Sequence, residues 1–397
     1  MTGPLNGVTI LDITAALSGP MATHVLGDMG ADVIKVEAPG GDSIRGLGKG
    51  RNPDMGPMFL HTNRNKRSVV LDLKTEGGRR AFLALAGKAD VVVCNTRPKA
   101  MARLGLDYAS MAELNPTLIY VGIVGYGSGG PLEDKPAYDD LIQAAAGIPS
   151  LHAAGEPGRY APFAFADRVT GMAAANAVLA ALFHRERSGE GQYVEVPMFE
   201  TIADLVLLDH MGGRTFEPAL GPTRFERYAS VRRPFETRDG QICLMVLTDR
   251  QWRTLFDALG HPELKEDERF ATVGQRHEHI AELYAIIASI LKTRDTDDWL
   301  SALEAADIPV GRVESIDSLL DHPHLAESGF FEWKEHPSEG TIRSIARSST
   351  WSRTQPGYAR PAPRLGQHTR EVLAEAGLKA DEIEALIASG AAQELEA

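Results

Sequence analysis

One aspartate in the sequence combines a reactive group with a position that favours its charged form. Asp167 stands at the start of an alanine-rich stretch, residues 168–185, which the pattern predicts to be helical. As a structural residue it would be an N-cap, its side chain accepting a hydrogen bond from an unpaired helical N–H. As a chemical group it would be an ionised carboxylate, stabilised by the positive helix end and competent as a nucleophile. Gly171 lies one turn further along the same face, where we expect it to leave space for a substrate.

A glycine-rich segment follows a predicted strand at residues 118–124, with glycines at Gly125, Gly127, Gly129 and Gly130. The spacing G-x-G-x-x-G is typical of nicotinamide sites, where the third glycine opens a helix whose N–H groups face pyrophosphate. Here residues 131–136 follow instead, and they are poor helix formers. The turn at residues 15–20, after the first predicted strand, lacks the G-x-G-x-x-G spacing, although Glu37 ends the second strand where a ribose-binding acid would lie. An NAD-binding oxidoreductase is therefore a remote alternative. The structural interpretation is a flexible loop that packs closely beneath a ligand or lid.

The composition excludes several classes of function. With 397 residues, 43% hydrophobic and 24% charged, the chain can bury a sizeable core and is not composed like a disordered segment. Lys and Arg number 41 against 54 Asp and Glu, and the net charge of −13 argues against a nucleic-acid partner, whose binding rests on released phosphate counterions. The N-terminus lacks a basic region followed by an apolar one, and no apolar run approaches a membrane span. We therefore expect a soluble, cytoplasmic protein without a membrane partner.

The cysteines indicate neither a disulfide framework nor a metal site. Cys94 and Cys243 are far apart, and each lies within its own apolar run. We expect both to be reduced, buried thiols, and we predict no metal site.

The elements that must position these residues follow an alternating pattern. Short β-branched runs are separated by helical stretches, which is typical of an α/β protein with an open, Rossmann-like parallel sheet covered by helices. The predicted strands are residues 8–13, 32–37, 68–73, 91–93, 118–124 and 192–196, and the predicted helices are residues 20–29, 76–86, 138–146 and 168–185.

The second half of the chain predicts a smaller inserted domain. Residues 234–247 have strand character with an Asp239-Gly240 turn, and residues 250–259 and 280–291 are amphipathic helices. The tail has a strand-like run at residues 330–334 and a final helix from Arg370. The predicted division is a large domain over residues 1–213, a linker over 214–233, a small α+β domain over 234–320, and a linker with a C-terminal part over 321–397.

Four groups of segments together give the chain a specific resemblance. They are Gly19-Pro20 with residues 26–37, residues 65–68 with 71–74, residues 137–139 with Gln143, and Ala166-Asp167 with Gly171 and residues 189–192. Through them nearly the whole chain resembles family III CoA-transferases of the CaiB/BaiF type, which include formyl-CoA and carnitine CoA-transferases. The resemblance implies a large domain built from both chain ends, so that residues 321–397 return to it, and an interlocked homodimer.

The resemblance implies a covalent mechanism at Asp167. The carboxylate attacks an acyl-CoA thioester to form a mixed anhydride, the released CoA thiolate attacks the aspartyl carbonyl, and a second carboxylic acid takes over the CoA. Such catalysis needs no metal or redox cofactor, and CoA is a substrate that is not permanently bound. Water must be excluded, because it would hydrolyse the anhydride. The segment from Gly125 to Gly130 then becomes a loop at the acyl end that closes or donates N–H groups to an oxyanion.

The resemblance also implies where CoA lies. In similar enzymes the nucleotide is held by residues that match Leu71, Asp72, Leu73, Lys74, Asn95, Thr96, Arg97 and Arg103. Lys135 and Tyr138 are expected beside the pantetheine, and the cations suit phosphate by charge. From the residues alone, Arg97 and Arg103 fit a solvated helix face equally well, and Tyr138 fits the core. Leu17 and Ala38 replace a Gln and an Arg of some members, and Arg45 or Arg51 is the expected replacement cation.

The sequence leaves two further alternatives to the transferase, and the first of them shares the predicted fold. In α-methylacyl-CoA racemases a histidine acts at the position of Tyr138, and a phenol is a poor proton shuttle near neutral pH, so the transferase is favoured over this isomerase. A non-catalytic CoA-binding protein is disfavoured because Asp167 is retained in its motif. No motif in the sequence identifies the two carboxylic acids between which CoA would move. The absence of a triple glycine near residues 215–225 argues against oxalate or formyl specificity.

Overall fold

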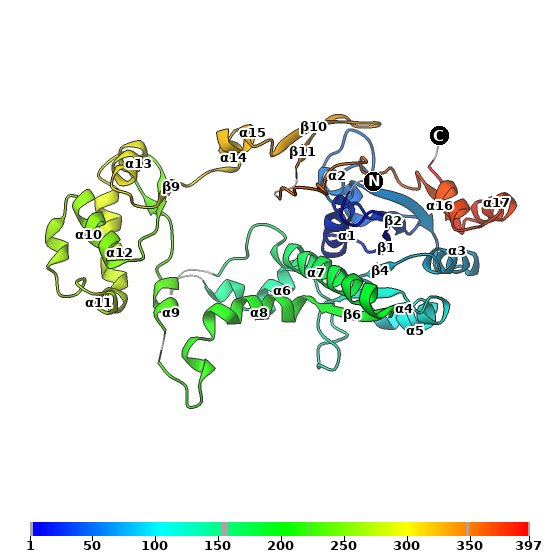
Figure 1. Cartoon of the computed structure of the whole chain (residues 1–397), viewed down its shortest axis with the longest axis horizontal. Coiled ribbons are helices and arrows are strands. Elements are labelled where there is room, and N and C mark those ends of the chain that lie inside the picture. The colour runs from blue at the N-terminus through cyan, green and yellow to red at the C-terminus, as the bar shows by residue number, and fades with distance from the viewer. Residues whose placement is uncertain (1–2, 152–157, 222, 347–348, 396–397) are drawn as a thin grey trace. The chain divides into compact units, whose positions relative to one another are not determined.

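The computed structural model describes residues 3–151, 158–221, 223–346 and 349–395. The chain divides into two compact units, the first formed by residues 1–148, 160–204 and 326–397 and the second by residues 149–159 and 205–325. The first unit contains both chain ends (Figure 1). The divisions at residues 204 and 325 lie near the predicted ones at 213 and 320, and the predicted domain boundaries stay a prediction.

The first unit is built on a seven-stranded sheet in the order β12-β3-β2-β1-β4-β5-β6. Six strands are parallel, and the short β12 pairs antiparallel with β3, placing Ala392 opposite Leu71. The order β3-β2-β1-β4-β5-β6 is that of doubly wound sheets, which bind ligands where the order reverses, here between β1 and β4. The strands are β1 (Thr9–Ile13), β2 (Asp32–Glu37), β3 (Lys66–Leu71), β4 (Val91–Cys94), β5 (Ile119–Val124), β6 (Gln192–Pro197) and β12 (Ala392–Gln393).

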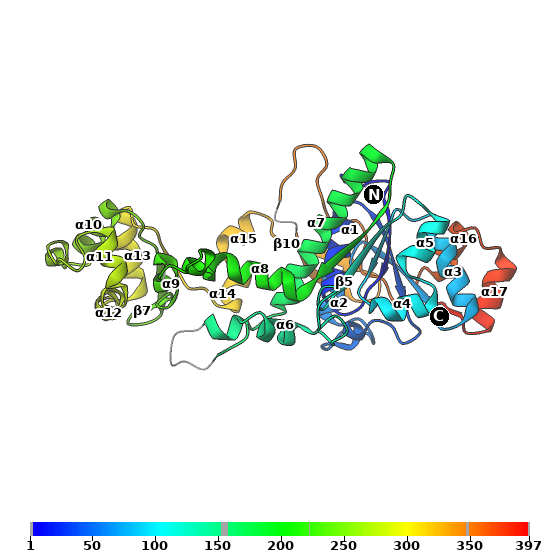
Figure 2. The same cartoon turned by 90° about the horizontal axis from the view of Figure 1, so that it is seen from below.

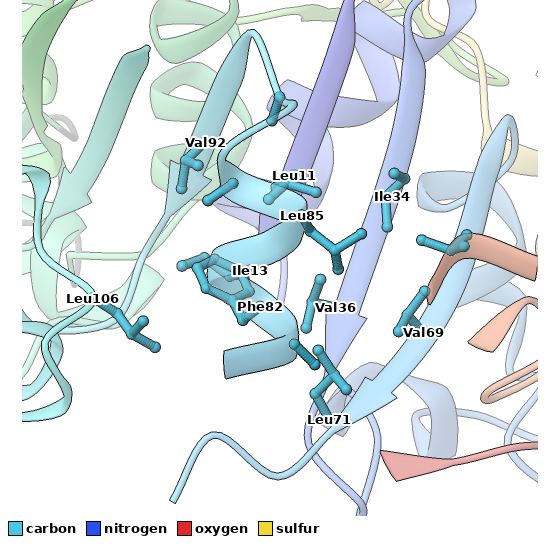
Figure 3. Close-up of a cluster of buried hydrophobic side chains, with 14 of the residues drawn as sticks. Leu11, Ile13, Ile34, Val36, Val69, Leu71, Phe82, Leu85, Val92 and Leu106 are labelled. Atoms are coloured by element: carbon cyan, nitrogen blue, oxygen red, sulfur yellow. The ribbon is translucent and has the colours of Figure 1, made fainter. Parts of the chain in front are cut away.

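Helices cover both faces of this sheet, which is why its strands are apolar runs rather than alternating ones. α1 (Ser18–Asp28) and α7 (Phe165–Ser188) lie on one face, and α3 (Glu76–Ala86), α16 (Thr369–Glu375) and α17 (Ala380–Ala388) lie on the other (Figure 2). On the second face Leu11, Val36 and Val69 pack against Phe82 and Leu85 of α3 (Figure 3). The remaining elements of the unit are α2 (Pro57–Thr62), α4 (Pro98–Leu104), α5 (Tyr108–Leu114), α6 (Asp139–Ala145) and the hairpin β10 (Phe331–His336) and β11 (Gly340–Ile345), while α8 (Met198–His210) and α15 (Pro323–Glu327) cross the division between units.

The second unit has its own core. A three-stranded antiparallel sheet, in the order β7-β8-β9, packs with helices around Trp252, Leu255, Phe256 and Trp299. The predicted turn at Asp239-Gly240 is confirmed, since it joins β7 and β8. Its elements are β7 (Phe235–Glu236), β8 (Gln241–Leu244), β9 (Val310–Arg312), α9 (Arg224–Ala229), α10 (Asp249–Ala258), α11 (Val273–Glu278), α12 (Ile280–Leu291), α13 (Thr296–Ala305) and α14 (Ile316–Leu320).

Three local predictions need correction. Cys243 is exposed, whereas Cys94 is buried, because β8 alternates and only Ile242 and Leu244 face the core. The predicted final helix is two helices, α16 and α17, and the predicted linker contains the short helix α9. In the part of the chain that the structure describes, no helix is long and apolar enough to cross a membrane.

Candidate active site

Asp167 lies in the first turn of α7, within the helix rather than before it. The helix begins at Phe165 and its N-cap residue is Ala164, so the interpretation of Asp167 as an N-cap is wrong. Its backbone N–H donates instead to Oδ1 of Asp139, at 3.0 Å. Asp139 is the first residue of α6, and its Oδ2 accepts a hydrogen bond from Nε2 of Gln143 at 2.6 Å. The carboxylate of Asp139 therefore caps α7 from another helix and leaves the side chain of Asp167 available.

The surroundings of Asp167 raise the pKa of its carboxyl above the ordinary value. Burial raises its pKa most, and the neighbouring Asp139 carboxylate raises it further, to about 6. Hydrogen bonds from Ser18 and the charge of Arg168 act in the opposite direction but are smaller. The expectation that the helix end would favour the ionised form is therefore overruled by burial and by a like charge. At neutral pH a carboxyl with this pKa is still about nine-tenths ionised, and it is more basic than an ordinary aspartate.

Gly171 has a different role from the one predicted. A Cβ at this position would lie 2.6 Å from the carbonyl oxygen of Ser18 and 2.8 Å from Cβ of Met21. The space beside Gly171 is thus filled by α1 and is not open to a substrate. The missing side chain lets α1 and α7 approach closely, and this contact holds Ser18 against the carboxylate of Asp167.

A cavity of about 320 Å³ lies at the carboxyl ends of the central strands. It sits beside the point where the strand order reverses, which is the usual ligand crevice of such sheets. The turn that leaves β1 contributes Thr14 and Ala15 to the cavity wall and, a few residues later, Ser18 to Asp167. Of the predicted CoA contacts, the cavity lining includes Leu71, Asp72, Leu73, Lys74 and Thr96.

The other predicted contacts lie outside this cavity lining. Asn95 is occupied structurally, since its amide donates to the carbonyl oxygen of Ala15 at 2.7 Å and accepts the Ala15 N–H at 3.0 Å. Arg97 and Arg103 are exposed at the two ends of α4, and Lys135 is exposed too. Tyr138, the residue before α6, is 72% exposed and does not face the core. Their contact with CoA stays a prediction.

Backbone N–H groups of the glycine-rich loop, residues 125–130, donate hydrogen bonds to glutamate side chains. Gly127 N–H lies 3.0 and 3.1 Å from the two carboxylate oxygens of Glu200, and Ser128 N–H donates to Glu195 at 2.8 Å. Gly129, at a φ of +83° that favours glycine, donates to Glu133 at 3.0 Å. These donors are bound to the chain's own carboxylates, so an oxyanion would have to displace them. None of these three glutamates was predicted to lie at the loop.

Buried charges fix the turn between β1 and α1. The side chain of Lys66 is fully buried and donates to Oδ2 of Asp12 at 2.9 Å and to the Pro20 carbonyl at 3.1 Å. Lys35 is equally buried and donates to the Thr14 carbonyl at 2.9 Å. Lys35 interrupts an apolar strand run in the sequence, which is a signal of a buried charge network, whereas Lys66 begins its strand among polar residues and gives no such signal.

Of the two expected replacement cations, Arg45 is held in a buried ion pair and Arg51 is exposed. Nε and Nη2 of Arg45 each donate to a carboxylate oxygen of Glu37 at 2.7 Å, and the side chain is buried. Nη1 of Arg51 donates to the carbonyl oxygen of Glu339 at 2.5 Å. The prediction that Arg45 serves a phosphate is therefore wrong, because its guanidinium is committed to Glu37. Arg51 is exposed and forms no ion pair with the described residues, so its contact with a phosphate stays a prediction. No group of His, Cys, Asp and Glu suited to a metal ion is found among the described residues.

Comparison with known proteins assigns this arrangement to a family. The model of CoA-transferase family III matches residues 5–369. The chain belongs to CoA-transferase family III. It is 36% identical to a succinate–glutarate CoA-transferase of Agrobacterium fabrum over 94% of this chain and 95% of that protein, and 34% identical to a probable fatty acyl-CoA transferase of Mycobacterium tuberculosis over 94% and 98%.

The solved structures agree with this family assignment. Rv3272 of M. tuberculosis superposes with a TM-score of 0.80 at 32% identity, covering 93% of this chain and 98% of that one. A CaiB/BaiF family protein of Brucella suis gives a TM-score of 0.81 at 29% identity, with coverage of 95% and 100%. The predicted family, the α/β fold class and the CoA-transferase class of enzyme are confirmed.

Proposed function

We propose that this family III CoA-transferase moves CoA from an acyl-CoA to a free carboxylic acid through covalent intermediates on Asp167. The observation that carries the proposal is that the short segment from the end of β1 to the start of α1 reaches both the cavity and the carboxylate of Asp167. Thr14 and Ala15, just after β1, line the cavity at the strand ends, and Ser18, which opens α1 a few residues later, acts on the Asp167 carboxylate and lowers its pKa. A nucleotide bound in the cavity would lie in the same unit as the carboxylate of Asp167, which is partly exposed and has a raised pKa.

The chemistry proceeds in balanced steps. A carboxylate oxygen of Asp167 attacks the thioester carbonyl, the C–S bond breaks, and CoA leaves as a thiolate from a mixed anhydride. The thiolate then attacks the aspartyl carbonyl and releases the first acid as a carboxylate, leaving an aspartyl-CoA thioester. The acceptor carboxylate attacks this thioester and regains a mixed anhydride, from which the thiolate forms the product thioester and frees Asp167.

The names of relatives suggest where the search for substrates should begin. Relatives include a succinyl-CoA:glutarate CoA-transferase of Mus musculus, 32% identical over 99% of this chain and 91% of that protein. We propose succinyl-CoA as the first donor to test, against a panel of dicarboxylic, branched and aryl acids. The α-methylacyl-CoA racemase reaction is disfavoured because Tyr138 stands where an imidazole would be needed.

We also propose that the chain acts as a homodimer. Along α8 and the segment after it, Leu205, Leu207, Leu208, Met211 and Phe216 are all exposed to at least 40%. A monomer rarely exposes so many large apolar side chains within one short segment, and a second copy of the chain would cover them. Light scattering of the purified protein would test this proposal, since a monomeric mass at micromolar concentration would contradict it.

The covalent intermediate can be trapped. Wild-type protein incubated with succinyl-CoA and hydroxylamine should yield a hydroxamate on the peptide that carries Asp167, detected by mass spectrometry. Asp167→Asn should show neither this modification nor transfer. Asp140→Asn is a matched control, because Asp140 is an exposed acid in the first turn of α6 and its loss should leave both unchanged. Full transfer activity in Asp167→Asn would contradict the proposal.

A further inference from the structure

A cavity of about 700 Å³ lies at the sheet edge formed by the returning C-terminal segment. Its lining includes Pro39, Val70 and Gln393 as well as Arg364 and Leu365. It adjoins the cavity of about 320 Å³ at the strand ends, called the nucleotide cavity from here on: a Cβ on Gly41, which lines that cavity, would lie 3.3 Å from Cδ1 of Leu365. Leu365, which lines the larger cavity, therefore lies against Gly41, which lines the smaller one, so the two cavities are neighbours.

The segment that carries Arg364 is fixed on both sides of that residue. Nη1 of Arg45 donates to the carbonyl oxygen of Pro363 at 3.2 Å, and Nε2 of His336 lies 2.9 Å from the carbonyl oxygen of Ala362. After it, Gly366 N–H donates to Oγ of Ser68 at 3.0 Å. The backbone around Arg364 is thus preorganised, while its guanidinium is exposed and makes no ion pair or hydrogen bond with the described residues.

The nucleotide cavity itself is short of free positive charge. Glu37 in its wall is neutralised by Arg45, and Asp42 by Lys35 at 2.8 Å. Lys74 is the cation of the lining whose ammonium forms no ion pair within the described part of the chain. CoA, however, carries a pyrophosphate and a separate 3′-phosphate on the ribose. Lys74 alone cannot neutralise the negative charges of both groups. An arginine suits a phosphate monoester because its guanidinium can donate two parallel hydrogen bonds.

We propose that Arg364 binds the 3′-phosphate of CoA, within the cavity that the C-terminal segment forms beside the nucleotide pocket. The proposal rests on the proposed function in that it assumes CoA in the adjoining cavity. It assigns the C-terminal segment a role in recognising the phosphorylated ribose, so that the chain distinguishes CoA from 3′-dephospho-CoA.

One acidic side chain in the cavity opposes an anion and supplies an independent test. Glu394 is paired with the guanidinium of Arg370, but Asp54 is exposed and makes no ion pair with described residues. Its backbone has a φ of +61°, a conformation that asparagine adopts readily. Asp54→Asn therefore removes the charge without straining the loop, and it should strengthen binding of the 3′-phosphate.

The experiment measures the affinity of the full chain for CoA and for 3′-dephospho-CoA by calorimetry. Wild type should bind CoA about tenfold more tightly, and Arg364→Ala should lose this preference by weakening CoA binding about tenfold while leaving dephospho-CoA unchanged. Arg364→Lys should keep part of the preference for CoA over 3′-dephospho-CoA, and Asp54→Asn should increase that preference. Arg353→Ala is the matched control, because Arg353 is an exposed arginine of the same tail that lines neither cavity.

The outcomes separate the two proposals. If wild type binds neither ligand, the proposed function itself fails. If wild type binds CoA and Arg364→Ala binds it equally well, or if Arg364→Ala weakens both ligands equally, the assignment of Arg364 to the 3′-phosphate is overturned while the transferase stands. Thermal melting of each variant shows whether it is folded, and the opposite signs expected for Arg364→Ala and Asp54→Asn cannot both arise from damage to the fold.

Discussion

Replacing the proposed nucleophile should make the protein more stable at neutral pH. The pKa of Asp167 is raised from 3.8 to about 6, so the folded chain binds this proton more tightly than the unfolded chain does. Stability contributed by such a group is present at low pH and falls as pH rises through the window from about 4 to about 6. Above that window the ionised carboxylate destabilises the fold. Asp167→Asn keeps the shape of the side chain and removes the charge.

The size of the effect follows from the shift. About two pH units correspond to about 3 kcal/mol, at about 1.4 kcal/mol per unit. Solvent screening at the partly exposed side chain reduces this, and the lost hydrogen bonds from Ser18 reduce it further, so we expect a gain of about 1–2 kcal/mol. The gain should be complete at pH 8 and should nearly vanish at pH 4.

Urea unfolding followed by tryptophan fluorescence at pH 4 and pH 8 would measure this difference against wild type. Asp140→Asn controls for the loss of an acid at a helix start, and it should show no comparable dependence on pH. A variant Asp167→Asn that is no more stable than wild type at pH 8, or equally stabilised at both values, would refute the reasoning. It would mean that burial and Asp139 do not act on this carboxyl as the structure indicates.

Other predictions follow from the same geometry. In wild type, kcat/KM should fall about tenfold per pH unit below pH 6, as the carboxyl of Asp167, with its pKa of about 6, takes up its proton; a profile flat to pH 4.5 would contradict this. Lys74→Ala should raise KM for the CoA ester more than it lowers kcat, and added salt should imitate part of that change in steady-state assays. Gly171→Ala should force α1 from α7, lowering stability by about 1–3 kcal/mol and activity with it, as denaturant titration and transfer assays would show. A thiol reagent should label Cys243 in the native protein and spare buried Cys94, whose pKa is raised by burial; peptide mapping would decide.

The sheet could be predicted from the sequence because each of its main strands is a short β-branched run closed by turn residues. The helices Glu76–Ala86 and Ile280–Leu291 have the very bounds that their patterns predict. β12, with only two residues, could not be found this way, since its existence depends on pairing with β3 and not on its own pattern. The resemblance to family III supplied what local patterns could not, namely that the tail returns to the first unit.

The site could be predicted only in part, because the sequence does not show which side chains meet. Asp167 and the run from Leu71 to Lys74 were predicted as site residues, and the structure brings that run into one cavity, while catalysis by Asp167 stays a prediction. The partners of Asp167 come from α1 and α6, and Ser18 and Asp139 carry no local signal of this contact. The role of Gly171 was wrong for the same reason, since the space beside a glycine belongs to whichever element packs there.

The raised pKa of Asp167 has two consequences of equal size. The ionised carboxylate destabilises the fold, and the same carboxylate becomes a better nucleophile for the proposed reaction. An alkyl thiol has a pKa near 8.5 and an ordinary aspartate one near 3.9, so moving an acyl group from thiolate to carboxylate is strongly uphill. Raising the carboxyl pKa to about 6 narrows that difference by about two units. The anhydride then becomes more accessible by up to about 3 kcal/mol, the same amount by which the buried charge opposes folding. A substitution such as Asp139→Asn, which removes the neighbouring charge and so lowers the pKa of Asp167, should therefore slow the first acyl transfer.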